Sequence, residues 1–232
     1  MRIQLPTIEG RFVRRYKRFF VDVLLANGET IVAHCPNTGS LAGCLVEGAR
    51  VVLRDSQNDA RKLRYVFQAI EVGKTLVNVD TSLPNHVVFE AVERGEVPEL
   101  SGYARVERER KYGKASRIDL LLTGEKGELC YVEVKNTTYA VGTCARFPDA
   151  ATERGLKHLD ELGNMVEQGH RAVQFFFVSR ADCREFRPAD EIDPKYAAGL
   201  RRATKRGVEV LAYDTRVAPD RLELRTRLPV AL

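Results

Sequence analysis

Two acidic residues and one lysine in this 232-residue chain are spaced so that their side chains could meet around a divalent metal ion. Asp119 lies in one short apolar run, and Glu133 and Lys135 lie in the next. The connection between the runs contains Gly124 and Gly127, which favours a tight antiparallel hairpin. A turn centred between these glycines puts Asp119 opposite Glu133, with Cβ atoms ~4.5–5.5 Å apart, and puts Lys135 on the same face.

Such a pair of carboxylates is the basis of a candidate hydrolytic site. Each carboxylate raises the pKa of the other unless a cation balances their charge. Mg²⁺ or Mn²⁺ suits this role because hard cations prefer carboxylate and water oxygens. A lysine beside the ion can orient a water molecule and offset charge that develops on a phosphate group. The pattern therefore predicts phosphodiester hydrolysis at Asp119, Glu133 and Lys135, with Mg²⁺ or Mn²⁺ as the cofactor.

The same spacing also fits a plain surface hairpin with a cross-strand glutamate–lysine pair. The apolar neighbours of the three residues favour the metal site, because they imply interior strands, where a charge without a partner is costly. A slip of one residue in the hairpin would separate the carboxylates. The hypothesis therefore depends on the register of the two strands.

The elements that must position these residues alternate between helices and strands after residue 83. Asn85 and Asp149 can cap helices that end near Arg94 and Gln168, and Asp193 followed by proline opens a third helix. The order α-β-β-β-α-β-α-β predicts a sheet covered by helices on both sides. Strands are expected at 103–112, 117–122, 129–135, 171–179 and 208–213.

The first 80 residues have strand and turn signals but no helical periodicity. Asn27-Gly28 marks a hairpin, and residues 35–39 are turn formers in series. About five short strands joined in this way predict a small β-barrel or sandwich. The chain is therefore expected to form two domains, residues 1–82 and 83–232.

Cations and aromatic residues are interleaved near the N-terminus. Five cations fall within residues 11–18, beside several Phe and Tyr residues, and 11–25 is expected to form one long strand. Cations bind backbone phosphates, and aromatic rings stack on bases in OB-type single-strand binders. The alternative is that the aromatic rings fill the barrel and the cations are merely solvated. The residues expected to contact nucleic acid, on this segment and a second basic one, are Arg14, Arg15, Tyr16, Lys17, Arg18, Arg61, Lys62 and Arg64.

Composition and charge limit the class of protein. Apolar residues make up 44% and charged residues 30%, and no apolar run approaches the ~20 residues that span a bilayer, so a soluble protein without a membrane partner is expected. Five cysteines without a CxxC pair predict free thiols in a reducing cytoplasm. Residues 1–80 carry 12 Lys+Arg against 8 Asp+Glu, which is +4 of the total +5, so attraction to polyanions such as DNA is expected there.

Asp119, followed by Glu133-Val134-Lys135 on the next strand within this order of elements, resembles the PD-(D/E)XK nuclease superfamily. In that fold an acidic residue of the first core helix often joins the metal site. The resemblance implies that Glu90 has this catalytic role here, with Glu93 as the alternative.

The helix after the third strand also contributes side chains to such sites. The resemblance implies that Arg154 or Lys157 meets a phosphate. His158 lies four residues after Arg154 on the same helix face. For His158 we expect burial beneath the sheet rather than a place in the site.

A longer resemblance spans essentially the whole chain. Its motifs are RYKRF at 15–19, HCPNTG at 34–39, ELSGY at 99–103, SRIDLLL at 116–122, YVEVKNTT at 131–138, FPDAATERGLKHL at 147–159 and the terminal LPVAL. Together they are similar to the sugar fermentation stimulation protein A family. The resemblance implies a two-domain α+β fold, with an N-terminal OB-fold-like β-barrel and a C-terminal PD-(D/E)XK nuclease-like αβββαβ core.

Two functions remain open at this point. The family resemblance implies a DNA-binding protein with little sequence preference and a suggested regulatory link to maltose metabolism. The alternative is a divalent-metal-dependent nuclease that hydrolyses phosphodiester bonds. Both hypotheses have DNA as the partner, and they differ in whether Asp119, Glu133 and Lys135 carry out chemistry.

Overall fold

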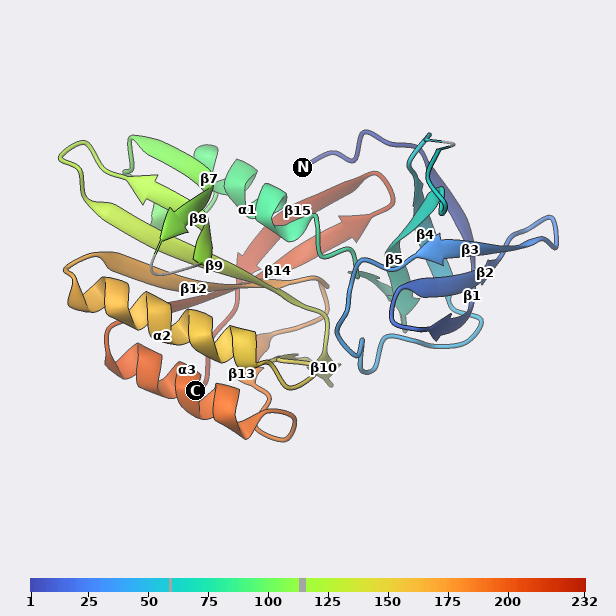
Figure 1. The fold of residues 1–232 in the computed structure, drawn as a ribbon. Coiled ribbons are helices and arrows are strands. Elements are labelled where there is room, and N and C mark those ends of the chain that lie inside the picture. The colour runs from blue at the N-terminus through green and yellow to red at the C-terminus, as the bar shows by residue number, and fades with distance from the viewer. Residues whose placement is uncertain (59, 113–115) are drawn as a thin grey trace.

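The computed structural model describes residues 1–58, 60–112 and 116–232, which form two domains (Figure 1). Strands β1 to β6 build the first domain, and helices α1 to α3 with strands β7 to β15 build the second. A short segment joins β6, which ends at Asn78, to α1, which begins at Pro84. The architecture is the two-domain α+β arrangement expected from the sequence, a β-barrel followed by an αβββαβ core.

The N-terminal domain is a six-stranded sheet that curls into a barrel. Its strands pair in the order β3-β2-β1-β4-β5-β6, and His34 of β3 also pairs with Val66 of β5. This extra pairing closes the barrel, and side chains such as Val21, Val23 and Phe67 fill it without exposure to solvent. The strands are β1 (Thr7–Tyr16), β2 (Phe20–Leu24), β3 (Thr30–His34), β4 (Arg50–Asp55), β5 (Tyr65–Val72) and β6 (Thr75–Asn78).

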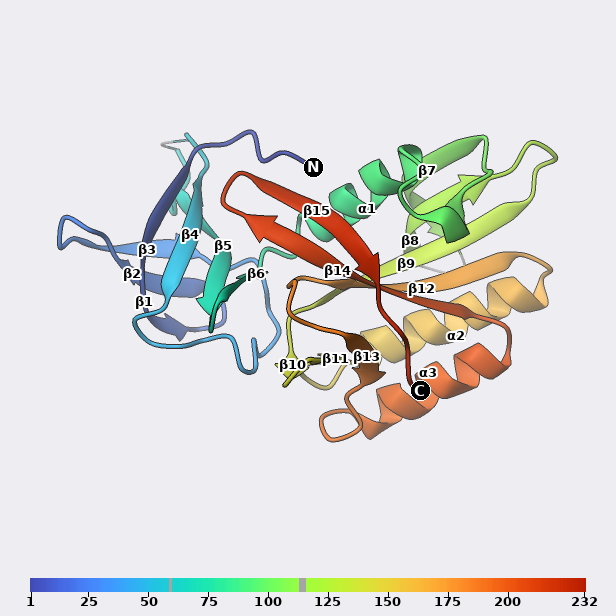
Figure 2. The same ribbon diagram turned by 180° about the vertical axis from the view of Figure 1, so that it is seen from behind.

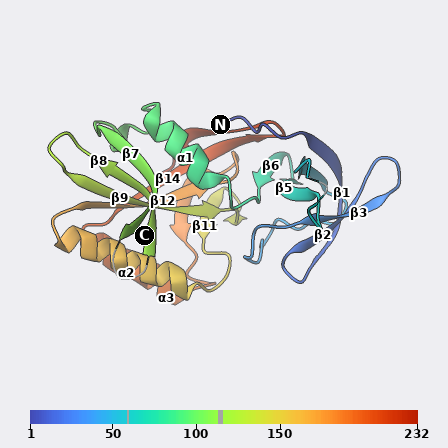
Figure 3. The same ribbon diagram turned by 45° about the horizontal axis from the view of Figure 1, so that its top comes forward.

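The C-terminal domain has a central sheet with the strand order β15-β14-β12-β9-β8-β7. Strands β7, β8 and β9 pair antiparallel, whereas β9, β12 and β14 pair parallel. Helix α1 covers one face, and α2 and α3 cover the other (Figure 3). The bounds are α1 (Pro84–Glu93), β7 (Arg105–Tyr112), β8 (Ser116–Thr123), β9 (Leu129–Thr137), α2 (Glu153–Glu167), β12 (Arg171–Val178), α3 (Pro194–Lys205), β14 (Glu209–Ala218) and β15 (Arg221–Arg227).

Several smaller elements had no clear sequence signal. Strands β10 (Ala140–Val141), β11 (Cys144–Phe147) and β13 (Glu185–Pro188) form a second, three-stranded sheet, and the 3-10 helix η1 (Pro98–Leu100) follows α1. The β14–β15 hairpin extends toward the N-terminal domain (Figure 2), where Gln68 Nε2 donates a hydrogen bond to Pro219 O at 3.0 Å. No helix of the described residues is long and apolar enough to cross a membrane.

The helix starts confirm one of the three expected caps. Asp193 caps α3, because its carboxylate accepts the main-chain amide three residues further on. Helix α2 begins after Thr152, whose hydroxyl caps it, so Asp149 is not the cap. The cap position of α1 belongs to Leu83, and Asn85 lies inside the first turn. Asp149 and Asn85 therefore remain available for contacts with other elements.

The basic segment is not one long strand, contrary to the expectation. Strand β1 ends at Tyr16 and β2 begins at Phe20, and these two residues pair across a reversal of the chain. Lys17 and Arg18 form the turn with positive φ values of 48° and 62°. A left-handed conformation is unfavourable for residues that have a Cβ atom, and such strain gathers at functional sites.

The turn can be tested with two variants that remove the same charge. Glycine adopts positive φ without the steric penalty, so Arg18→Gly should be more stable than Arg18→Ala by roughly 0.5–1 kcal/mol. Urea denaturation measures both free energies of unfolding. Equal stabilities would contradict the left-handed conformation at Arg18.

Candidate metal and phosphate site between the domains

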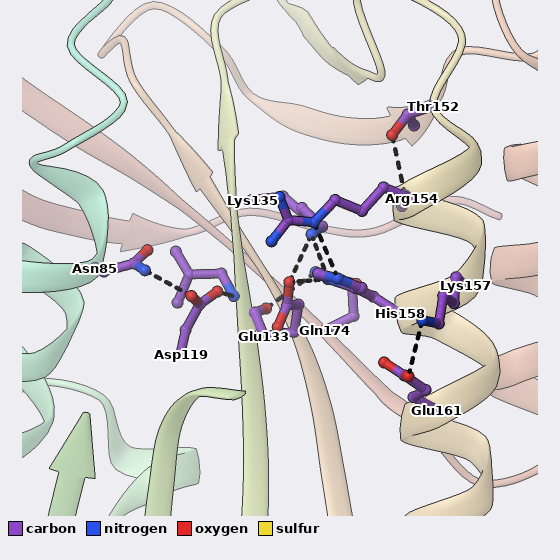
Figure 4. Close-up of polar contacts among 12 residues, drawn as sticks. Asn85, Asp119, Glu133, Lys135, Thr152, Arg154, Lys157, His158, Glu161 and Gln174 are labelled. Atoms are coloured by element: carbon purple, nitrogen blue, oxygen red, sulfur yellow. Dashed lines mark hydrogen bonds and ion pairs between the residues drawn. The ribbon is translucent and has the colours of Figure 1, made fainter. Parts of the chain in front are cut away.

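A cavity of about 750 Å³ opens where the two domains meet. The C-terminal domain supplies its floor, and the N-terminal domain supplies one wall. The polar residues that line it include Asn85, Asp119, Glu133, Lys135, Asp149, Arg154 and His158 from the floor, and Arg15, Arg18 and Asn37 from the wall. Asp119, Glu133 and Lys135 therefore lie together, as the sequence predicts, and Figure 4 shows their polar contacts.

The hairpin has the predicted register up to the edge of the site. The β8–β9 ladder ends at the pair Leu120–Val132. The next residue, Asp119, accepts the amide of Val134 on Oδ2 at 2.8 Å and the side-chain amide of Asn85 on Oδ1 at 2.7 Å. A carboxylate thus takes the place of a main-chain acceptor, and the two strands part where the cavity forms.

Glu133 is only 2% exposed, and cationic or donor groups surround one of its oxygens. Its Oε1 accepts a hydrogen bond from Lys135 Nζ at 2.7 Å and contacts Nδ1 of His158 (Figure 4). Arg154 Nε donates to Nε2 of His158 at 3.4 Å. Because Nε2 accepts from Arg154, Nδ1 is the ring nitrogen of His158 that contacts Glu133.

The two carboxylates have opposite pKa shifts. Burial raises the pKa of Asp119 to about 6, and the charge of Glu133 adds to this effect. Burial also acts to raise the pKa of Glu133, but the hydrogen bond from His158 and the charge of Lys135 outweigh it, so the pKa lies below its ordinary value. The pair is therefore doubly charged near neutral pH, which suits a cation.

One oxygen of Glu133 fits a metal ligand. Oε2 is buried and has no hydrogen-bond partner in the part of the chain that the structure describes. Such an orphaned charged atom is costly unless something outside the chain binds it. No group of three Asp, Glu, His or Cys side chains among the described residues is arranged to hold a metal. Asp119 and Glu133 would therefore hold an ion together with water or main-chain oxygens, as is usual for Mg²⁺.

The structure does not bring Glu90 to these residues, contrary to the expectation. Its carboxylate pairs with Arg94 at 2.8 Å, one turn further along α1. Glu93 is exposed and lies outside the cavity. The first turn of α1, rather than its middle, meets Asp119, so Asn85 occupies the position for which an acidic residue was expected.

Arg15 shapes the wall of the cavity. Its guanidinium donates to the main-chain oxygens of Asn37 and Gly39 at 2.7 and 2.8 Å. It also donates to the main-chain oxygen of Arg18 at 3.0 Å. These bonds occupy the guanidinium, so Arg15 fixes the loop and the basic turn rather than presenting an open phosphate-binding group.

The other cations of this segment differ in how firmly they are held. Arg14 pairs with Asp22 at 2.7 Å and lies over the ring of Tyr16. Lys17 and Arg18 are exposed, and their side chains form no ion pair with any described residue. Arg18 also lines the cavity, so the turn is the part of the segment best suited to meet a phosphate.

The second basic segment lies elsewhere on the barrel. Arg61, Lys62 and Arg64 follow β4, beside the start of β1, and Arg64 pairs with Asp55 at 2.7 Å. The basic turn lies at the other end of β1, roughly 30 Å along that strand. These three residues therefore do not line the cavity.

Asp149 joins the two domains. Its Oδ2 accepts the amide of Leu41 at 2.8 Å, and its main-chain oxygen accepts the hydroxyl of Ser40 at 2.5 Å. A Cβ at Gly39 would lie 2.7 Å from Asp149 Oδ1, so this loop has no room for a side chain there. The wall of the cavity is thereby attached to its floor.

Comparison with known proteins identifies the family of this architecture. Residues 82–221 match the sugar fermentation stimulation protein RE domain, and residues 13–79 match the SfsA N-terminal OB domain. The chain belongs to the sugar fermentation stimulation protein family. Homologs of that protein from Geobacter metallireducens and Geotalea uraniireducens are 50% and 47% identical, each over 100% of both chains. The structure of Pyrococcus furiosus SfsA in complex with Ca²⁺ is 28% identical with a TM-score of 0.89, over 100% of this chain and 98% of that one.

Sequence reasoning missed two residues of this family member's site. His158 is buried beneath the sheet as expected, but it also contacts Glu133. The one feature of the sequence that pointed to the site was its place one helical turn after Arg154. Asn85 was taken for a helix cap. Of the two cations expected from α2, Arg154 lines the cavity, whereas Lys157 lies 3.8 Å from Glu161 outside it.

The raised pKa of Asp119 predicts how stability depends on pH without metal. The folded carboxyl keeps its proton up to about pH 6 and the unfolded one only to about pH 4, so the free energy of unfolding falls as pH rises through this window. Asp119→Asn cannot titrate. Its stability relative to wild type should rise by up to about 3 kcal/mol between pH 4 and 7.

Denaturation in EDTA at several pH values measures this difference between the two proteins. Effects of the substitution that do not depend on pH cancel in the comparison, because they shift the difference by the same amount at every pH. A difference that stays constant from pH 4 to 7 would contradict the assigned environment of Asp119.

Proposed function

We propose that this protein binds DNA at the cavity between its domains and hydrolyses phosphodiester bonds there with a divalent metal ion. The observation that carries the proposal is the buried, unpartnered Oε2 of Glu133 beside Asp119. A site that needed only to bind DNA would have no use for two buried carboxylates, because both repel phosphates. A cation bound between the carboxylates and a phosphate group would offset the repulsion between them.

Asp119 and Glu133 are the residues that would hold the metal. The Ca²⁺ complex of the Pyrococcus furiosus protein supports an oxygen-ligand cation site in the family, and Mg²⁺ or Mn²⁺ uses the same ligand types. When bound, such an ion lowers the pKa of a coordinated water and offsets charge on the phosphate. Asn85 and His158 keep the two carboxylates in position through their hydrogen bonds.

Lys135 and Arg154 supply positive charge on the protein side. Lys135 Nζ lies 2.7 Å from Glu133 Oε1, so its charge is next to the site where water and phosphate would meet. In this position it orients the attacking water and stabilises the transition state. Arg154 is exposed at the rim, and with Arg18 on the opposite domain it binds the phosphates on either side.

A second candidate is a DNA-binding platform that does not cleave. It is favoured by the contacts of Lys135 and His158 with Oε1 of Glu133, because among the described residues they leave only Oε2 of this carboxylate open to an ion. In this case Lys135 is one phosphate contact among several. The regulatory link to maltose metabolism stays a prediction of the family resemblance in either case.

Metal binding should raise the melting temperature. A ligand that binds only the native state at 100 times its Kd adds about 2.7 kcal/mol, or roughly 5–10 °C in Tm for a chain of this size. Asp119→Asn should abolish the shift produced by millimolar Mg²⁺ or Mn²⁺. Asp160→Asn is the matched control, because Asp160 is an exposed carboxylate on α2 outside the cavity. Equal shifts in both variants would exclude a site at Asp119.

Cleavage should depend on Lys135 more than DNA affinity does. Because Lys135 acts on the transition state, Lys135→Ala should reduce single-turnover cleavage on the order of 10²-fold or more and leave DNA retention nearly unchanged. Lys157→Ala is the control, since Lys157 is an exposed lysine on the neighbouring helix α2 and lies outside the cavity. Labelled single- and double-stranded DNA with Mg²⁺, Mn²⁺ or EDTA provides the assay.

The possible outcomes separate the two candidate functions. Metal-dependent products from wild type that disappear in Glu133→Gln support the nuclease. If Lys135→Ala cleaves as fast as wild type, the role of Lys135 is wrong although the protein is a nuclease. If wild type yields no products from any form of DNA, the platform is the function.

A further inference from the structure

We infer that DNA enters this cavity as a single strand, with one base stacked on Phe19 at the rim. The inference rests on the proposed function and adds to it the form of the substrate and a base-binding residue. It comes from three observations: an exposed aromatic ring, its place in the chain directly after a cation that lines the cavity, and the burial of Glu133 at the cavity floor.

Phe19 is an exposed ring that is nevertheless held in place. Its side chain is 46% exposed, the highest value for any aromatic residue that the structure describes. The ring lies parallel to that of His34, with centroids 6.4 Å apart and an interplanar angle of 6°. Its main-chain oxygen accepts the amide of Cys35 at 2.8 Å. A fixed aromatic face open to solvent is the feature on which single-strand binders stack bases.

Phe19 does not itself line the cavity, but its neighbours in the chain do. It directly follows Arg18, the exposed cation that lines the cavity. Its partner Cys35 lies two residues before Asn37, which also lines the cavity and receives a hydrogen bond from Arg15. The base platform and a phosphate-binding cation are thus adjacent residues, and the strained turn fixes their relative directions.

The candidate ligands lie inside a cavity rather than on an open face. The cavity has a volume of about 750 Å³ and is lined by residues of both domains. Glu133, at the floor, is 2% exposed. A single strand can place a phosphate at this depth while its neighbouring base remains at the rim, so the geometry favours a single strand or a frayed end.

The experiment measures binding in EDTA, where no cleavage occurs. Fluorescence anisotropy compares a 20-nucleotide single strand, a blunt duplex of the same sequence, and the matching RNA strand. Stacking on an aromatic side chain contributes about 1–3 kcal/mol per base, so Phe19→Ala should weaken single-strand binding about 5- to 150-fold. The slope of affinity against salt should not change, because no phosphate contact is lost.

Two further variants control for folding and for the loss of apolar surface. Phe19→Tyr keeps an aromatic face and should restore binding. Leu24→Ala removes another exposed apolar side chain, 40% exposed at the far end of β2, and should change nothing. A strand containing 2-aminopurine reports stacking directly, since its fluorescence should fall on wild type and on Phe19→Tyr but not on Phe19→Ala.

The inference is supported if single-stranded DNA binds more tightly than the duplex and Phe19→Ala removes that preference. It is overturned if the duplex binds equally well, if RNA binds more tightly than DNA, or if Phe19→Ala has no effect. A separate incubation with Mn²⁺ tests cleavage. If single-stranded DNA binds preferentially but no products form, the proposed hydrolysis is wrong and the role of Phe19 stands. If duplex DNA is cleaved as fast as single-stranded DNA, the proposed hydrolysis stands and the single-strand inference is wrong.

Discussion

The carboxylate of Glu133 is almost entirely buried, and the surrounding elements supply the charges and hydrogen bonds that compensate its loss of hydration. A buried carboxylate is strongly destabilising unless charges and hydrogen bonds compensate it. Lys135 compensates it from the same strand, and His158 does so from α2. Gln174 of the neighbouring strand β12 donates its side-chain amide to the main-chain oxygen of Glu133 at 3.0 Å. The side chain of Glu133 therefore ties α2 to the sheet, and its main-chain oxygen adds a contact between β9 and β12.

The parting of β8 and β9 makes room for ligands in what would otherwise be a continuous sheet. Main-chain hydrogen bonds between paired strands leave no space for a substrate, so a site within a sheet needs an interruption. Asp119 creates it by accepting the amide of Val134, and Asn85 at the start of α1 occupies the other oxygen. The interruption satisfies the main-chain amide, so the chain gains an opening without leaving a buried donor unpaired.

Local patterns in the sequence could predict the elements and the core of the site, but not the contacts between distant elements. The hairpin register was predictable because Gly124 and Gly127 limit where the turn can lie, and this alone brings Asp119 and Glu133 together. Asn85 and Asp149 were assigned as caps because residues of their type favour helix starts. Neither of them caps a helix, because Asn85 contacts Asp119 of strand β8 and Asp149 contacts Leu41 of the other domain, and such contacts are not a local property of the sequence. Periodicity likewise could not show that Lys17 and Arg18 reverse the chain, because turns at non-glycine residues have a weak signal.

The attachment of residues 39–41 to Asp149 has a consequence for how the protein matures. The N-terminal domain contains the exposed cations Lys17 and Arg18, and the C-terminal domain contains Asp119 and Glu133, so the two groups belong to different domains. During synthesis the barrel emerges first and can attract polyanions before any acidic pair exists. The wall of the cavity meets its floor only where residues 39–41 contact Asp149. Assembly of the two domains is therefore the step that, under the proposed function, would bring the cations of the N-terminal domain to the two carboxylates.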